Sequence, residues 1–122
     1  MKPSILKTKS QEFGSLAIDF YKFLNSQKLY EIAKQFLKSA TSIGANISES
    51  KYAESKKDFI HKLHIALKEA VETEYWIELL KNESKTYKNF SILENENKVL
   101  IFILTKSIRT AKQNEQINKR TD

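Results

Sequence analysis

A regular spacing of small and apolar residues in the middle of the chain most restricts its fold. Seven such positions follow one another at alternating intervals of four and three, the heptad pattern of a helix with one continuous buried stripe. They are Phe59, Leu63, Ala66, Ala70, Thr73, Ile77 and Leu80. This stripe predicts a helix over about residues 56–81, with Ser55 as its N-cap and Asp58 in its first turn. Such a helix needs other helices to cover its stripe.

Turn-forming residues are too scarce for most alternatives to a helical fold. The 122 residues include two glycines, Gly14 and Gly44, and one proline, Pro3. Sandwiches, barrels and doubly wound sheets need many sharp turns, and a phosphate-binding loop needs clustered glycines. The chain has no cysteine, which excludes disulfides and thiolate metal sites. We therefore expect a single all-α domain.

Three further segments have helical periodicity. We expect helices over about residues 10–24, with Ser10 as N-cap, 28–49, and 91–114, where Ser91 and Glu94 form a capping box. The polar residues 115–122 are expected to form a frayed tail. Because the connections are short, consecutive helices should be antiparallel. The prediction is an up-down-up-down four-helix bundle that spans residues 1–122 as one domain.

The last predicted helix has more apolar surface than one bundle face needs. Its core positions are expected to be Leu93, Leu100, Leu104, Ile108 and Ala111. Val99, Phe102 and Ile103 are expected to project from the opposite side and to form a contact between copies of the chain. The alternative is a wide core that absorbs both sides of the helix.

A line of polar residues runs beside the apolar stripe of the predicted 28–49 helix. Ser42, Asn46 and Glu49 belong to it, and Glu69 and Glu72 are possible counterparts on the next helix. These five residues predict a polar network between helices, although ordinary local hydrogen bonding would account for them as well. Gly44 costs about 1 kcal/mol relative to alanine inside a helix, which predicts close approach of another backbone there.

The charge balance allows a polyanionic partner. The formal net charge is +6, with 21 basic residues. Lys98, Lys106, Arg109 and Lys112 fall within an arc of about 120° on the last helix, which makes them candidate nucleic-acid contacts. A solvated helix face is the alternative. We expect no aromatic residue to be interleaved with these bases, so no stacking platform for single strands is predicted.

No enzyme signature is present. Asp58, His61 and His64 only faintly resemble one half of a di-iron motif, whose chemistry needs two such motifs on facing helices. We therefore assign no catalytic, cofactor-binding or metal-binding residue and predict that the chain is not an enzyme. No apolar run reaches 18 residues, so we expect no membrane association and a cytoplasmic location.

Several segments resemble one known family. They are TSIGANISE at 41–49, SKKDF at 55–59, IALKEA at 65–70 and ETEYW at 72–76. Together with the residues around them, from about residue 9 to 113, they are similar to the four-helix-bundle family of 23S rRNA intervening-sequence proteins. Members of that family resemble an accessory protein of diversity-generating retroelements, which binds nucleic acid and a reverse transcriptase.

The resemblance implies a ring-shaped homopentamer with no established catalytic activity and no cofactor. It implies that the partners are the chain itself and, by common conjecture, RNA or DNA or an enzyme that handles nucleic acid. The leading hypothesis is therefore a non-enzymatic, oligomeric binding module. The second hypothesis is a purely structural or protein-interaction ring that binds no nucleic acid.

Overall fold

Four long helices make up most of the protein. The computed structural model describes the backbone of residues 3–121 and the side chains of residues 5–117. The helices are α1 (Pro3–Ser26), α2 (Tyr30–Ser50), α3 (Lys56–Leu79) and α4 (Phe90–Thr121), with a short 3₁₀ helix, η1 (Asn82–Ser84), before α4. Residues 3–121 contain no strand. The predicted all-α domain of four helices is confirmed.

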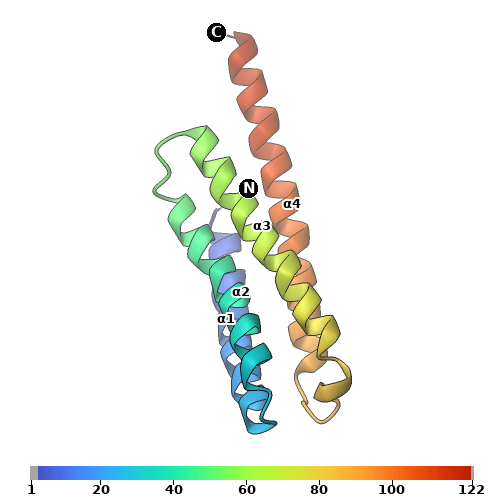
Figure 1. Cartoon of the computed structure of the whole chain (residues 1–122). Helices are drawn as coiled ribbons and strands as arrows, with labels where there is room; N and C mark the ends of the chain where they lie inside the picture. The colour runs from blue at the N-terminus through green and yellow to red at the C-terminus, as the bar shows by residue number, and fades with distance from the viewer. Residues whose placement is uncertain (1–2, 122) are drawn as a thin grey trace.

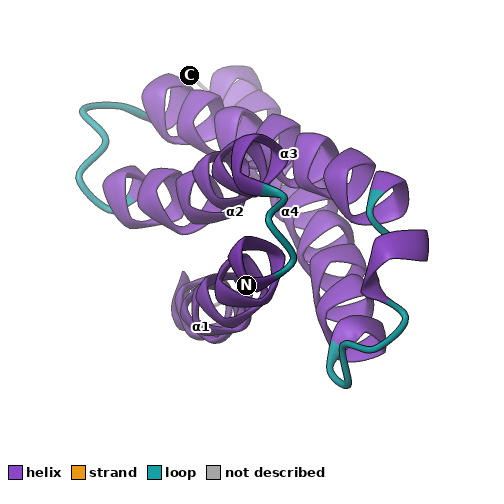
Figure 2. Ribbon diagram, turned by 60° about the horizontal axis from the view of Figure 1, so that its bottom comes forward, coloured by secondary structure: helices purple, strands orange, loops and turns teal. Residues whose placement is uncertain are grey.

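Consecutive helices run in opposite directions. Figure 1 shows α1 and α2 side by side, α3 crossing next to them and α4 on the far side of α3. Figure 2 shows the molecule with the α1–α2 turn and the α3–α4 connection at the end nearer the viewer. The C-terminal part of α4 extends well beyond the α2–α3 connection (Figure 1). None of these helices, over the residues described, is apolar enough for long enough to span a bilayer.

Two of the helices are longer than their sequence patterns indicated. α1 begins at Pro3 rather than at Ser10, and Ser10 is a buried residue inside the helix whose Oγ donates to the Lys7 carbonyl at 3.1 Å. Proline is well suited to the first turn of a helix because it needs no hydrogen-bond partner for an N–H. α4 continues to Thr121 instead of ending near residue 114. Its polar end contains no helix-breaking residue, and Lys, Gln, Glu and Arg are good helix formers. Asp122 lies outside the described residues.

The caps of the helices match the predictions in part. Ser55 Oγ accepts a hydrogen bond from the Asp58 backbone N–H at 3.1 Å, which confirms the predicted N-cap of α3. Ser91 lies inside α4, because that helix begins at Phe90. α1 ends in a Schellman motif: the Leu29 N–H bonds to the Leu24 carbonyl, and Lys28 adopts a positive φ of 65°.

The core follows the predicted stripes closely. All five core positions of α4 are buried, and so are six of the seven α3 positions, with Phe59 half-buried against them.

An aromatic cluster closes the end of the bundle near the α1–α2 turn. There the ring of Phe20 lies 5.1 Å from those of Phe36 and Tyr87 and 5.9 Å from that of Phe90. Burial of each phenylalanine contributes about 1.5–3 kcal/mol.

Gly44 packs beside α1 but does not need to be glycine. A Cβ added there would lie 3.6 Å from Ser10 Cβ and Oγ, which is ordinary van der Waals contact. The expected backbone does approach here, since the Ser10 carbonyl oxygen would lie 3.8 Å from that Cβ, but the space is enough for a methyl group. Gly14 would meet no atom within 4 Å.

Candidate nucleic-acid interface

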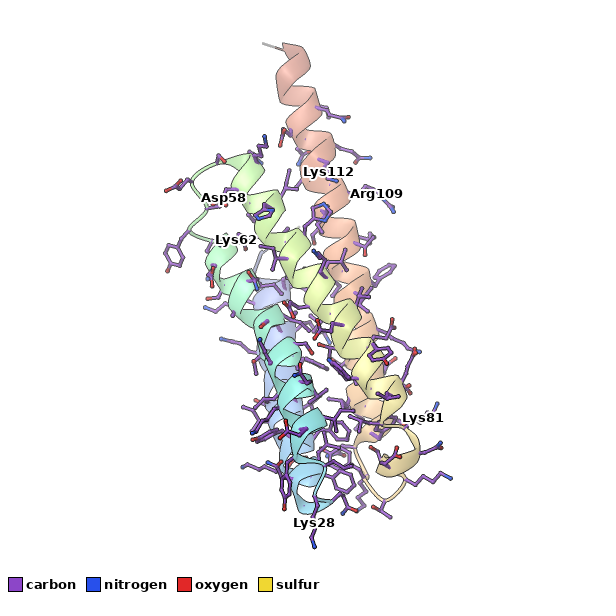
Figure 3. All side chains as sticks on the ribbon, viewed as in Figure 1. Lys28, Asp58, Lys62, Lys81, Arg109 and Lys112 are labelled. Atoms are coloured by element: carbon purple, nitrogen blue, oxygen red, sulfur yellow. The ribbon has the colours of Figure 1, made fainter. Side chains whose placement is uncertain are left out.

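The four basic residues predicted to contact nucleic acid lie on the outer face of α4. The opposite face of this helix is held by buried leucines, including Leu93, Leu100 and Leu104. This packing leaves the basic side chains exposed to solvent, and these are Lys98, Lys106, Arg109 and Lys112. Figure 3 shows Arg109 and Lys112 on the half of α4 nearer the C-terminus, far from α1. We call these four residues the basic face.

An aromatic side chain lies within the basic face. Phe102 is 63% exposed, and the Lys106 Nζ lies 5.5 Å from the centre of its ring. Lys98, Phe102 and Lys106 occupy successive turns of α4, and at 100° per residue Phe102 is only about 40° from Lys98. The expectation that no aromatic residue is interleaved with the bases is therefore wrong. The contact between an ammonium and a ring face is a favourable cation–π arrangement.

The three residues predicted to contact another copy are exposed to different extents. Ile103 packs against the core and Val99 is half-buried, whereas Phe102 is mostly exposed. α1 borders this side of α4, as the ion pair between Lys9 Nζ and Glu96 Oε1 at 3.5 Å indicates. The outward apolar surface of α4 is consequently smaller than its sequence alone indicated.

A second apolar surface lies on α3. Val71, Tyr75 and Leu79 follow at intervals of four, and each is about half exposed. They fall outside the heptad stripe, so a search for core positions does not single them out. The signal that could have identified them is the same i, i+4, i+8 spacing, shifted to the solvent side of the helix. We call these three residues the α3 stripe.

The predicted polar network is only partly brought together. Ser42 Oγ donates to the Lys38 carbonyl at 2.7 Å, and Asn46 Nδ2 donates to the Ser42 carbonyl at 2.9 Å, so both bonds stay within α2. Glu49 Oε1 does reach α3, where Lys62 Nζ lies 3.0 Å away. These contacts favour local hydrogen bonding, with a single ion pair between α2 and α3.

The two glutamates on α3 do not contact the polar line of α2. Glu72 Oε2 accepts a hydrogen bond from Trp76 Nε1 at 3.2 Å, within the same helix. Burial, reinforced by the charge of Glu72, raises the pKa of Glu69, while Lys38 and Lys68 act in the opposite direction. The buried polar link between α2 and α3 is instead Thr73 with Ser39, whose hydroxyl oxygens are 2.8 Å apart.

Positive charge dominates where the C-terminal half of α4 passes α3. Burial and the charges of Lys112 and His61 lower the pKa of His64, which favours its neutral form. Among the described side chains, no group of three or more histidine or acidic residues is arranged to hold a metal ion. The chemistry available on α4 is thus the attraction of anions by four bases around an exposed aromatic ring.

Comparison with known proteins identifies a matching family and a crystal structure with a closely similar fold. Residues 3–106 match the family described as 23S rRNA-intervening sequence protein. A crystal structure from Bacteroides thetaiotaomicron VPI-5482, of a protein with unknown function from the S23 ribosomal protein family, shares 47% sequence identity. The match covers 89% of this chain and 99% of that chain, with a TM-score of 0.83. No curated protein matches this sequence.

Proposed function

Because this chain belongs to the family of 23S rRNA-intervening sequence proteins, we propose that it is a non-enzymatic, oligomeric protein that binds single-stranded nucleic acid. The binding surface is the basic face of α4 with Phe102 at its centre. The observation that carries this proposal is the exposed Phe102 ring with the Lys106 ammonium 5.5 Å from its centroid. An exposed ring among bases combines the two elements that single-strand binding uses, stacking and phosphate attraction.

The chemistry of the basic face favours sequence-independent contacts. Three of its four bases are lysines, which attract phosphates as point charges, and only Arg109 offers the bidentate fork that reads guanine edges. A flipped or unpaired base can stack on Phe102, while base pairs in a duplex keep their faces hidden. We therefore assign single-stranded nucleic acid as the ligand of this face.

The proposal includes assembly of the chain into a ring-shaped homopentamer in the cytoplasm. The α3 stripe supports self-association, because adjacent half-exposed apolar side chains usually mark a contact surface. Five copies of a weak basic face, presented together, would bind one long strand much more tightly than a single copy. Light scattering tests the ring, which must have five times the 14.2 kDa mass of one chain.

A protein-directed role is the second candidate. The resemblance to the accessory protein of diversity-generating retroelements suggests a nucleic-acid enzyme, such as a reverse transcriptase, as partner. In a purely structural ring, Phe102 would be covered by protein, and its exposure in the single chain supports that reading too. Phe102→Ala separates the two candidates: it should weaken nucleic-acid binding if Phe102 stacks on bases, and it should change the oligomeric mass if Phe102 is covered by protein in a ring that binds no nucleic acid.

The experiment is a salt titration of binding to a labelled single strand of about 20 nucleotides, followed by fluorescence anisotropy. We compare the native protein with Phe102→Ala and with Lys106→Gln/Arg109→Gln. Loss of stacking costs about 1–3 kcal/mol, and each lost phosphate contact reduces the slope of log affinity against log salt by about 0.7.

The matched control is Lys81→Gln/Lys85→Gln, which removes two charges from exposed lysines in the α3–α4 connection. This control should leave the affinity within about twofold, because screened surface charges outside the contact contribute little. Absence of binding at about 50 mM salt overturns the proposal. So does an equal loss in the control variant.

A further inference from the structure

A cavity of about 520 Å³ opens at the end of the bundle where α1 starts, α2 ends and α3 begins. It lies beside the α2–α3 connection, near Asp58 in Figure 3. Its floor is apolar, and Leu6, Ile47 and Leu63 in it are buried. The half-buried ring of Phe59 completes this floor. The volume falls within the range of small-molecule sites in proteins, about 300–1,000 Å³.

Three lysines border the cavity. Lys7 comes from α1, Lys51 from the end of α2 and Lys56 from the first turn of α3, and all three are exposed. The residues that line the cavity include no aspartate or glutamate. Neither of the ion pairs between Lys9 and Glu96 or between Lys62 and Glu49 involves these lysines. We call them the rim lysines.

Lys7 and Lys51 of the rim repel each other, and no acidic residue among those described lines the cavity to neutralise them. Lys7 and Lys51 line the same cavity, and Lys7 lowers the pKa of Lys51 through a hydrogen bond and through its charge. The nearby carboxylate of Asp58 accepts a hydrogen bond at 3.1 Å from the backbone N–H of Glu54, on the connection itself. An anion placed between Lys7 and Lys51 would relieve their repulsion.

From this arrangement we propose that the cavity binds a small amphipathic anion. The apolar chain or ring of the ligand lies on the floor of the cavity, and a carboxylate or phosphate group lies between the rim lysines. The charges of the rim select the anionic end, and burial of apolar surface supplies most of the affinity. This site is separate from the basic face of α4, and its existence does not depend on nucleic-acid binding.

The test measures the binding of four ligands with the same ten-carbon chain by calorimetry, below their micelle concentrations. The ligands are decanoate, decyl phosphate, decanol and decyltrimethylammonium. We expect decanoate or decyl phosphate to bind at least about fivefold more tightly than decanol, and the cation to bind most weakly. Whichever anion binds more tightly identifies the head group. Equal binding of decanol and both anions overturns the proposal, as does the absence of binding by either anion.

Three variants locate the ligand. Lys7→Gln/Lys51→Gln should lower the affinity for the preferred anion about five- to tenfold. Lys81→Gln/Lys85→Gln, which removes the same charge at the opposite end of the bundle, should change it by less than about twofold. Ala53→Leu adds apolar volume to the cavity lining and should weaken all four ligands, provided that circular dichroism shows a native helix content.

Two results would contradict this assignment. An equal loss of affinity in Lys81→Gln/Lys85→Gln would mean that net charge, rather than the cavity, attracts the ligand. If Lys7→Gln/Lys51→Gln changes the sedimentation coefficient of the native protein, the cavity belongs to a contact with a second copy, and the proposal fails.

Discussion

Thr73 Oγ1 on α3 lies 2.8 Å from Ser39 Oγ on α2, and both residues are buried in the core. Both hydroxyls also have backbone partners within their own helices: Ser39 Oγ lies 3.1 Å from the Phe36 carbonyl and Thr73 Oγ1 lies 2.7 Å from that of Glu69. The two hydroxyls have only two hydrogens for these three contacts, so the hydrogen bond from Thr73 Oγ1 to Ser39 Oγ competes with the one from Thr73 Oγ1 to the Glu69 carbonyl. The contact joins α2 and α3 inside the core.

Thr73→Val should lower the free energy of unfolding by about 0.5–1.5 kcal/mol, the net contribution of one hydrogen bond. Valine keeps the shape of threonine, and the Ser39 hydroxyl retains its bond to the Phe36 carbonyl. Urea denaturation of Thr73→Val, Ser39→Ala and the double variant forms a double-mutant cycle. A coupling energy near zero would show that the contact between the two hydroxyls contributes nothing.

Asn97 has a buried side-chain amide, and among the described residues only one of its two polar atoms has a hydrogen-bond partner. Its Nδ2 donates to the Ala70 carbonyl at 3.0 Å, and no partner for Oδ1 lies among the described residues. Asn97→Leu keeps the branching of the side chain and removes this buried polar group. We expect it to raise the free energy of unfolding by about 0.5–2 kcal/mol in urea. A loss of stability would contradict this prediction, because it would show that the hydrogen bond to the Ala70 carbonyl contributes more than the unpaired Oδ1 costs.

Alanine should fit at both helical glycines. Neither Gly14 nor Gly44 has a positive φ, and neither lacks room for a methyl group. Gly14→Ala and Gly44→Ala should each raise the free energy of unfolding by about 0.5–1 kcal/mol, because alanine has the higher helix propensity. Thermal denaturation of the two single variants checks this. A variant that folds but shows a changed oligomeric mass would reveal that the glycine is required by a contact between copies.

Lys28 is the described non-glycine residue with a positive φ, at 65°. It occupies the position of the α1 Schellman motif that glycine usually fills, where a side chain is sterically unfavourable. Lys28→Gly should therefore stabilise the protein by about 0.5–1 kcal/mol, in contrast to the cost of glycine inside a helix. Lys34→Gly, at an exposed interior position of α2, is the control and should destabilise by about 1 kcal/mol.

Tyr87 should make stability decrease at alkaline pH. Burial and its hydrogen bond to the Asp19 carboxylate raise the pKa of Tyr87 well above its usual value. Because the folded state holds this proton more tightly than the unfolded state, the stabilisation is complete below about pH 10 and is lost as pH rises further. Tyr87→Phe keeps the ring that packs on Phe20 and Phe23.

Urea denaturation between about pH 9 and 11 measures this effect. The free energy of unfolding should fall more steeply for the native protein than for Tyr87→Phe, with a difference of less than about 1 kcal/mol because the phenol is partly exposed. Titration of the lysines is common to both proteins and cancels in the comparison. Parallel curves would contradict the role of Tyr87.

The periodicity of the sequence predicted the helices and the core well, and predicted the helix ends less well. Burial at Leu93, Leu100 and Leu104 follows directly from spacing. The start of α1 at Pro3 does not, since Ser10 resembles a cap in sequence but forms an ordinary bond inside a helix. Polar residues at the end of α4 indicated fraying, although helix propensity rather than polarity decides whether a helix continues.

The sequence also predicted only part of the candidate sites. The basic face could be predicted because its residues share one helix, whose 3.6-residue period places them together without any neighbour. The error about Phe102 was one of angular placement on that same helix. The exposure of Phe102 follows from the same period, whereas the packing of Ile103 against the core depended on where the other helices lie, which no pattern within α4 contains.

By itself, the sequence determined four amphipathic helices, the side of each that is buried, and a line of bases on the last one. These properties are local, because hydrophobic periodicity and helix geometry act over a few turns of one segment. Only the tertiary structure brought Lys7, Lys51 and Lys56 to the rim of one cavity and joined Ser39 to Thr73. Those relationships connect residues far apart in the chain, so they exist only once the helices have packed in a particular register and crossing geometry.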